Sequence, residues 1–183
     1  MRAIAPALFL FSHALFAQQI SDISPSLRIA LKQEIAKASS FSDRFEAEVW
    51  LVDMSGRIEN LVDDKLERLQ ILKAAHSQAS RHQLPISIVL GLIETESHFN
   101  RFALSPAGAQ GLMQIMPFWK LEIGNPQDNL IDIETNIHYG CTILKHYLKI
   151  ENGNMSKALA RYNGSKGSTK YPNKVQKNQL KYN

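Results

Sequence analysis

One loop constrains the fold of this chain more than any other segment. Pro106, Gly108, Gly111 and Pro117 interrupt residues 100–117, and proline and glycine at this density break both helices and strands. The sequence on both sides of the loop has the spacing of amphipathic helices, whereas the alternation typical of strands is scarce. The sequence therefore predicts a mainly α-helical protein with one long structured loop.

Capping residues set the bounds of the expected helices. Leu84 precedes a proline and so disfavours helix, while Pro85 suits the first turn of a new one. Asp132 can cap a third helix, and Asn163-Gly164 can end a fourth. The expected helices are 63–83, 85–97, 133–149 and 155–162, with a last turn or two near Pro172.

Residues 1–17 are typical of a secretory signal peptide. Arg2 is followed by an uncharged, largely apolar run from Ala3 to Phe16, and the small residue Ala17 precedes a polar pair. This order of basic start, apolar run and small residue marks exported proteins. The run is short for a membrane span, and the alternative is an uncleaved N-terminal anchor.

The rest of the chain divides into an extension and a main domain. Residues 18–62 are interpreted as an N-terminal helical extension. It should hold a helix from Ser24 to Ala38 and a less regular stretch with a turn at Gly56. Residues 63–183 carry the strong helical pattern and form the predicted main domain.

Positive charge gathers at the C-terminal end of this chain, whose formal net charge is +4. No acidic residue follows Glu151. The basic residues after it are Lys157, Arg161, Lys166, Lys170, Lys174, Lys177 and Lys181. The segment is either a solvated lysine-rich tail or a surface attracted to an anionic polymer such as a cell wall. Zinc-finger spacing and aromatic–basic RNA motifs are missing, so nucleic acid is not an expected partner.

The single cysteine and the histidines suggest no metal chemistry. Cys141 cannot form an internal disulfide, and its helical spacing with Ile137 and Leu144 predicts a small core residue. The histidines lack close metal-ligand spacing, and the sequence has no phosphate-binding loop. No metal and no cofactor are therefore expected.

Two glutamates near the end of the second helix are candidates for acid–base chemistry. Glu94 and Glu96 are two residues apart, so on a helix their side chains point about 200° apart and cannot face each other. Glu96 continues the apolar face of Val89, Leu92 and Ile93, whereas Glu94 falls on a less apolar face. Burial and the helix C-terminus should both raise the pKa of Glu96, as a general acid requires. The alternative is a helix-end glutamate paired with a lysine.

The loop that follows could approach a ligand closely. Its small residues leave the backbone accessible, and Gln114 offers donors and an acceptor suited to sugar hydroxyls or N-acetyl groups. The alternative is a compact loop whose methionines fill the core. His98, Phe99 and Phe102 are candidates for sugar contacts, whereas Phe118 and Trp119 are expected in the core.

Three blocks of sequence, in this order and spacing, resemble the soluble lytic transglycosylase family. They are Glu96-Ser97, the Gly-Ala-x-Gly-Leu-Met-Gln-Ile-Met-Pro run at 108–117, and Ala-Arg-Tyr-Asn-Gly at 160–164. The resemblance covers roughly residues 66–181, and its middle block is the most specific. One departure is Gly164-Ser165, where many members carry Ala-Gly.

The resemblance implies a lysozyme-like fold, with residues 63–183 as a catalytic domain whose long loop lies beside an active-site cleft. It implies that Glu96 is the lone catalytic residue. As acid it protonates the oxygen between N-acetylmuramic acid and N-acetylglucosamine, and as base it takes the proton of the C6 hydroxyl that attacks the anomeric carbon. The product is a 1,6-anhydro sugar. The residues that match the family's substrate-binding positions are Ser105, Gln114, Met116, Tyr162 and Asn163.

Two other functions remain open at this point. A lysozyme-type muramidase would hydrolyse the same bond, and a non-catalytic wall-binding adaptor could place a secretion assembly. All three act on peptidoglycan glycan strands in the periplasm or envelope, without stable membrane insertion once the signal peptide is removed. Ser97 is expected to support the fold or Glu96. Tyr162 could form a hydrogen bond near Glu96 or with the substrate, and the alternative is a core aromatic at a helix end.

Overall fold

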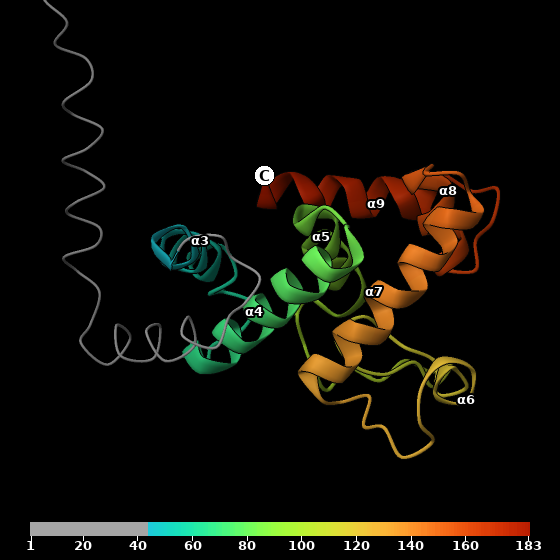
Figure 1. Ribbon diagram of the computed structural model, residues 1–183, viewed down its shortest axis with the longest axis horizontal. Helices are drawn as coiled ribbons and strands as arrows, with labels where there is room; N and C mark the ends of the chain where they lie inside the picture. The colour runs from blue at the N-terminus through green and yellow to red at the C-terminus, as the bar shows by residue number, and fades with distance from the viewer. Residues whose placement is uncertain (1–43) are drawn as a thin grey trace, which may run out of the picture.

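The computed structural model describes residues 44–183, and within them the chain is helical (Figure 1). The predicted signal peptide and the helix from Ser24 to Ala38 lie outside the described residues. The elements are α3 (Arg44–Arg57), α4 (Lys65–His82), α5 (Ile86–Ser97), α6 (Trp119–Ile123), α7 (Ile133–Ile150), α8 (Met155–Tyr162), α9 (Lys170–Gln179) and the 3-10 helix η1 (Leu180–Tyr182). Residues 44–183 form no strand beyond isolated bridges at Gln110. The mainly helical fold is confirmed.

Helices α4, α5, α7 and α8 begin and end within two residues of the predicted bounds. The Asp64 carboxylate accepts a hydrogen bond from the Glu67 amide at 2.8 Å at the start of α4. Asp132 accepts one from the Thr135 amide at 2.9 Å at the start of α7. Gln83 ends α4 in the left-handed conformation, with φ of 51°. These local bonds satisfy amides and carbonyls that helix ends leave free.

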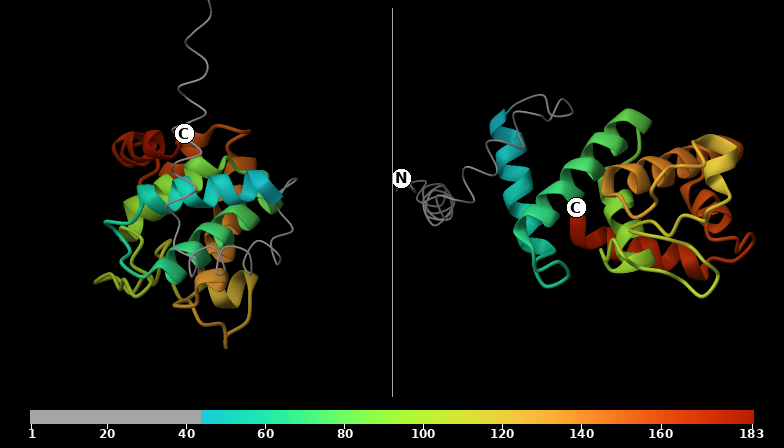
Figure 2. Two further views of the ribbon diagram at one scale, coloured as in Figure 1. Left: turned by 90° about the vertical axis from the view of Figure 1, so that its left-hand side faces the viewer. Right: turned by 90° about the horizontal axis from the view of Figure 1, so that it is seen from below.

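Helix α5 is the buried centre of the molecule. All its residues from Ser87 to Glu94 are buried. Helices α4 and α9 and the short η1 pack against it, while α7 packs across α4 and α8. Figure 2 shows α3 and α8 at opposite ends of the molecule, with α5 and α9 between them. Any side chain near the end of α5 is therefore placed by several helices at once.

Helix α3 is more regular than the sequence suggested. The stretch around Gly56 is not irregular, because Gly56 lies inside the 14-residue helix α3. Ala47, Leu51 and Met54 of this helix are buried in the same apolar cluster as α4 and α5. Tertiary packing thus overrides the weak local signal. The division of the chain at residue 63 stays a prediction.

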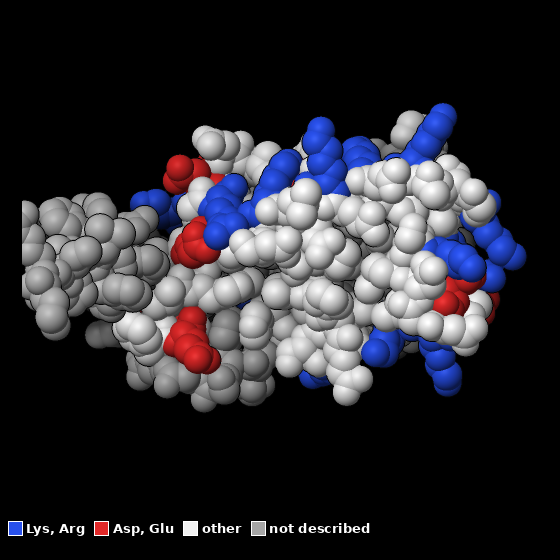
Figure 3. Space-filling view, turned by 90° about the horizontal axis from the view of Figure 1, so that it is seen from above, with Lys and Arg blue, Asp and Glu red and all other residues white. Residues whose placement is uncertain are grey.

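The basic C-terminal segment is not a solvated tail. Pro172, Val175 and Asn178 of α9 are buried, and Val175 belongs to the core cluster. The lysines lie on the outer face, and Figure 3 shows basic side chains in a row along one edge of the surface seen from above. The prediction of a turn or two near Pro172 was wrong in length, because α9 runs for ten residues.

The long loop is fixed to α7 by one buried amide. Asn136 donates from Nδ2 to the carbonyls of Gln110 and Leu130, both at 2.8 Å. Its Oδ1 accepts from the Met113 amide at 2.7 Å. Two of these bonds go to the backbone of the loop, at Gln110 and Met113, and the third goes to Leu130 just before α7. The loop is therefore a fixed wall of the structure, although it has little regular secondary structure.

The two aromatic residues after the loop differ from each other. Trp119 packs partly buried against the core, as expected. Phe118 was expected there too, but 51% of its surface is exposed. The short helix α6 begins at Trp119 and was not predicted; one turn gives too little periodicity to detect. Among residues 44–183, no helix combines the length and apolarity needed to cross a bilayer.

Replacing Gly91 with alanine should loosen α9 from α5. A Cβ at Gly91 would lie 2.7 Å from the Gln179 amide nitrogen and 2.9 Å from the Val175 carbonyl oxygen. Both are backbone atoms that can move only with α9. We expect Gly91→Ala to lower the free energy of unfolding by about 1–3 kcal/mol in urea denaturation.

Gly56→Ala is the matched control. Gly56 is exposed in α3 and its added Cβ would meet no atom within 4 Å. Alanine favours helix over glycine by up to about 1 kcal/mol, so this variant should be as stable as the wild type or more so. Equal stability of the two variants would contradict the proposed close contact of α5 and α9.

Candidate active site

Glu96 lies in the last turn of α5, where it meets a side chain from α9. The Tyr171 hydroxyl donates a hydrogen bond to Oε1 of Glu96. Glu96 is half-buried. Lys174, one helical turn after Tyr171, donates to the Thr95 carbonyl at 3.5 Å. Helix α9 thus brings both a hydroxyl and a positive charge to the end of α5.

Burial raises the pKa of Glu96, as the sequence predicted. Removal from water penalises the charged carboxylate more than the neutral acid. The hydrogen bond from Tyr171 and the charge of Lys174 oppose this effect, and they do not cancel it. Glu96 therefore holds its proton to higher pH than an exposed glutamate, which suits proton donation.

Glu94 has a different environment from the one expected. It was assigned to the less apolar face, yet it is only 6% exposed. Its Oε1 accepts from the Lys181 ammonium group, and its Oε2 accepts from the Tyr182 hydroxyl at 2.7 Å. The sequence pattern missed this because both partners come from the C-terminal segment packed onto α5. Glu94 is thus occupied by structural contacts, while Glu96 is not paired with a lysine.

The C-terminal segment is itself held in place by α3. The Arg57 guanidinium donates to the backbone carbonyl of Lys181 at 2.8 Å and to that of Asn183 at 3.1 Å. It also pairs with Asp53 at 2.8 Å. Contacts therefore run from α3 through η1 to Glu94 on α5.

Tyr162 lies close to Glu96 and bonds to the loop. Its hydroxyl donates to the Met113 carbonyl at 2.8 Å. Burial, followed by the negative charge of Glu96, raises the pKa of Tyr162. Tyr162 therefore remains a neutral phenol that joins the end of α8 to the loop beside Glu96.

Sequence reasoning missed Tyr171. Its bond to Glu96 spans 75 residues of sequence, and it lies in a helix that the sequence scarcely indicated. Burial and the neighbouring Glu96 charge raise its pKa, so it remains a donor. The only available signal was an aromatic hydroxyl beside Pro172.

The glutamine predicted to bind sugar turns toward its own loop. Nε2 of Gln114 donates to the carbonyls of Ala103 at 3.2 Å and Gly111 at 3.1 Å. Its backbone is left-handed, with φ of 50°. Ser97 ties the same loop to α5, since its Oγ donates to the Leu112 carbonyl at 2.8 Å. Ser97 thus supports the fold, as expected, while the Gln114 side chain is held in a fixed position.

The other predicted binding residues are placed less centrally. Oγ of Ser105 accepts from the Ala109 amide at 2.9 Å and shapes the loop. Met116 is half-buried, and Asn163 is exposed at the end of α8. No hydrogen bond within residues 44–183 joins these three side chains to Glu96. Their role in substrate binding stays a prediction.

Of the aromatics considered for sugar contacts, Phe99 does not qualify. It is 1% exposed and stacks edge-on with Tyr182, so it belongs to the core. Phe102 is 66% exposed, with the Arg101 guanidinium 4.9 Å from its ring centre. An exposed aromatic of this kind can stack on a sugar ring.

Cys141 is fully buried, and burial raises the pKa of its thiol to about 12. It is a core residue, as predicted, and stays protonated at neutral pH. Within the described range, His, Cys, Asp and Glu side chains form no cluster of three or more that could bind a metal ion.

Comparison with known proteins identifies one family. The family model described as the transglycosylase SLT domain matches residues 73–183. A protein named transglycosylase from Enterobacteria phage PRD1 is 32% identical over 117 residues, which are 60% of this chain and 43% of the relative. The soluble lytic murein transglycosylase of Escherichia coli K12 is 27% identical over 147 residues, 74% of this chain and 22% of the relative. The chain thus spans less than half the length of these relatives.

The lytic transglycosylase Slt of Pseudomonas aeruginosa, in an inactive mutant form, aligns with a TM-score of 0.48 and 20% identity. The alignment covers 90% of this chain and 35% of that one.

The two glutamates should respond differently to removal of their charge. Since the pKa of Glu96 is raised above its ordinary value of 4.5, the folded state binds more protons than the unfolded state. The stability of the wild type therefore falls as the pH rises from 4.5 through the raised pKa. Glu96→Gln should match the wild type at pH 4 and become relatively more stable across that window, as measured by urea denaturation.

Glu94→Ala is the contrasting variant. It leaves the Tyr182 hydroxyl and Lys181 without their partner, and should cost about 1–3 kcal/mol of unfolding free energy at pH 7. If Glu96→Gln were destabilised as strongly at pH 7 as Glu94→Ala, Glu96 would be a structural residue.

Proposed function

This chain belongs to the transglycosylase SLT domain family, and we propose that it is a lytic transglycosylase that cleaves peptidoglycan glycan strands. The bond cleaved is the β-1,4 link from N-acetylmuramic acid to N-acetylglucosamine. The observation that carries the proposal is a half-buried glutamate with a raised pKa, at a helix end, held by a tyrosine.

In the first step Glu96 acts as a general acid. Its protonated carboxyl donates to the glycosidic oxygen as the bond to the anomeric carbon breaks. The N-acetylglucosamine then leaves with a neutral hydroxyl, and Glu96 becomes a carboxylate. Tyr171 donates to that carboxylate and stabilises it when its charge develops.

In the second step the same carboxylate acts as a base. It takes the proton from the C6 hydroxyl of the muramic acid, whose oxygen bonds to the anomeric carbon. The product carries a 1,6-anhydro ring, Glu96 regains its proton, and no water is consumed. The nucleophile belongs to the substrate, so orientation contributes more than activation.

This scheme needs only one carboxylate, in contrast to the paired acids of most glycosidases. Glu94 is the nearest second glutamate in sequence, and its oxygens are bonded to Lys181 and Tyr182. It is therefore not available as a partner across a sugar. That arrangement supports Glu96 as the sole catalytic residue.

The walls beside Glu96 provide the proposed sugar contacts. Ser105, Gln114 and Met116 would meet substrate from the loop, and Tyr162 and Asn163 from the end of α8. The bonds of Tyr162 to Met113 and of Ser97 to Leu112 hold these two segments at fixed positions near Glu96. Contacts held in fixed positions orient the sugar for the reaction at Glu96.

We place the enzyme in the periplasm or envelope on the pattern of residues 1–17, which lie outside the described range. Recovery of a mature chain without these residues from the periplasmic fraction would establish this location. An uncleaved chain in the membrane fraction would support the anchor instead.

Glu96→Gln tests the chemistry. Purified sacculi are digested and the fragments analysed by mass spectrometry. The wild type should release 1,6-anhydro ends. Glu96→Gln should be at least about 100-fold slower, because the glutamine amide cannot donate a proton as a carboxylic acid does. Glu59→Gln, an exposed glutamate of the loop after α3, is the control and should retain wild-type activity.

Other outcomes of that digestion point to other functions. Reducing ends without anhydro ends would mean a lysozyme-type muramidase. Equal lysis by the wild type and Glu96→Gln would remove Glu96 from the mechanism. Binding to sacculi without any lysis would indicate a wall-binding adaptor.

Tyr171→Phe tests the tyrosine through the pH profile. The hydrogen bond from Tyr171 lowers the pKa of Glu96, so its loss should raise that pKa further. The limb of the pH–rate profile that reports Glu96 should move to higher pH, and kcat should fall about tenfold or more. A lower kcat with an unmoved profile would mean that Tyr171 only supports the packing of α9.

A further inference from the structure

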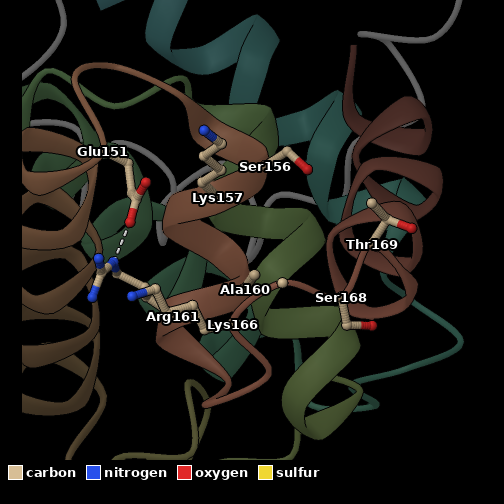
Figure 4. A pocket seen from close by; sticks show the side chains of 9 residues that line it. Glu151, Ser156, Lys157, Ala160, Arg161, Lys166, Ser168 and Thr169 are labelled. Atoms are coloured by element: carbon tan, nitrogen blue, oxygen red, sulfur yellow. Dashed lines mark hydrogen bonds and ion pairs between the residues drawn. The ribbon is translucent and has the colours of Figure 1, made fainter.

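A pocket lies at the end of the molecule formed by α8 and the α8–α9 connection (Figure 4). Its volume is about 510 Å³, within the range of small-ligand sites, about 300–1,000 Å³. The lining residues are Glu151, Ser156, Lys157, Ala160, Arg161, Lys166, Gly167, Ser168 and Thr169. None of them is a residue assigned to the chemistry at Glu96.

The pocket and Glu96 lie on different sides of α8. Ser156, Lys157, Ala160 and Arg161 line the pocket and share one face of the helix at about 100° per residue. Tyr162, which bonds to the loop beside Glu96, points to roughly the opposite face. The pocket is thus a separate concavity, and the wall of α8 lies between it and the candidate active site.

The pocket carries excess positive charge. Arg161 is bonded to the Glu151 carboxylate, and this bond lowers the pKa of Glu151 and keeps it ionised. Lys157 and Lys166 form no ion pair within residues 44–183. Their charges also lower the pKa of Glu151, so three cations surround one carboxylate and the net charge of the lining is positive. An anionic ligand would balance this excess charge.

Hydroxyl groups complete the lining. In Figure 4 the Glu151 carboxylate and the Arg161 guanidinium meet on one side of the pocket, with Ser168 and Thr169 across from them. Thr169 precedes α9, yet its side chain makes no capping bond to that helix. Ala160 is buried between the two sides. The cations and hydroxyls can form charge-assisted hydrogen bonds to a carboxylate. The lining therefore suits a carboxylate on a short peptide better than an uncharged sugar.

We propose that this pocket binds a carboxylate of the peptide substituents carried by the glycan strand. The inference rests on the proposed function, since muramic acid carries acidic peptides at its lactyl group. The pocket lies outside the sugar contacts, so it would add affinity for peptide-bearing strands over bare ones.

The pocket is also connected to the catalytic glutamate. The lining segment 166–169 leads directly into α9, and Tyr171 follows Thr169 by two residues. Tyr171 is the donor to Glu96. A ligand that fixes segment 166–169 would therefore also fix the start of the helix that positions Tyr171.

The first experiment compares peptide-bearing glycan strands with strands whose peptides have been removed by an amidase. The wild type should cleave the peptide-bearing strands faster. The double variant Lys157→Gln/Lys166→Gln should lose about tenfold of that preference and keep the wild-type rate on bare strands. The matched control is Lys65→Gln/Lys177→Gln, which removes the same charge from exposed sites outside the pocket. Its preference should not change.

The second experiment measures binding without catalysis. NMR titration uses three probes: a free stem tetrapeptide, the same peptide with its carboxylates amidated, and inorganic phosphate. Only the free peptide should shift the amide signals of Gly167 and Ser168, and the double variant should lose these shifts. Absence of shifts with the free peptide overturns the proposal, and so do equal shifts with phosphate or with the amidated peptide.

The two experiments separate the two proposals. Equal rates of the wild type on both kinds of strand, or an unchanged preference in the double variant, overturn the peptide site and leave the transglycosylase intact. If the wild type cleaves neither strand, the proposed activity fails, and the titration alone decides the pocket.

Discussion

The close contact of α5 with α9 is the constraint on which the candidate site depends. Because Gly91 has no Cβ, the backbone of α5 can approach the backbone of Val175 and Gln179 in α9 closely. At that distance Tyr171 reaches Glu96, and Lys181 and Tyr182 reach Glu94. A wider separation would break both sets of bonds. Helix packing thus decides the chemistry of both glutamates.

Glu94 and Glu96 lie two residues apart, but the fold gives their carboxyl groups different partners. Glu94 gains a cation and a hydroxyl, which compensate for its burial. Glu96 gains only one hydroxyl and a more distant lysine, so burial dominates and raises its pKa. Glu94 is thus held by the fold, while the carboxyl group of Glu96 keeps its proton to higher pH than an exposed glutamate. This difference supports the proposal that Glu96 acts as the sole acid.

The fold was largely predictable, because its signals are local. Asp64 and Asp132 cap helices through bonds to residues three positions later, and Leu84-Pro85 separates α4 from α5. Helix α9 and the helical course of α3 were not predictable in this way. Lysines cover the outer face of α9, and Gly56 interrupts the pattern of α3. Both helices are stabilised by burial against distant elements, which a local pattern does not record.

The sequence by itself determined helices α4, α5, α7 and α8, the buried Cys141 and the family, since each depends on periodicity or on motifs within short stretches. It also singled out Glu96 as the proposed catalytic residue. Only the tertiary structure decided that Glu94 is buried and paired, that Phe99 belongs to the core, and that Tyr171 bonds to Glu96. The same holds for the basic pocket beyond α8. These features depend on contacts between residues far apart in the chain, and the packing of α9 on α5 brings them together.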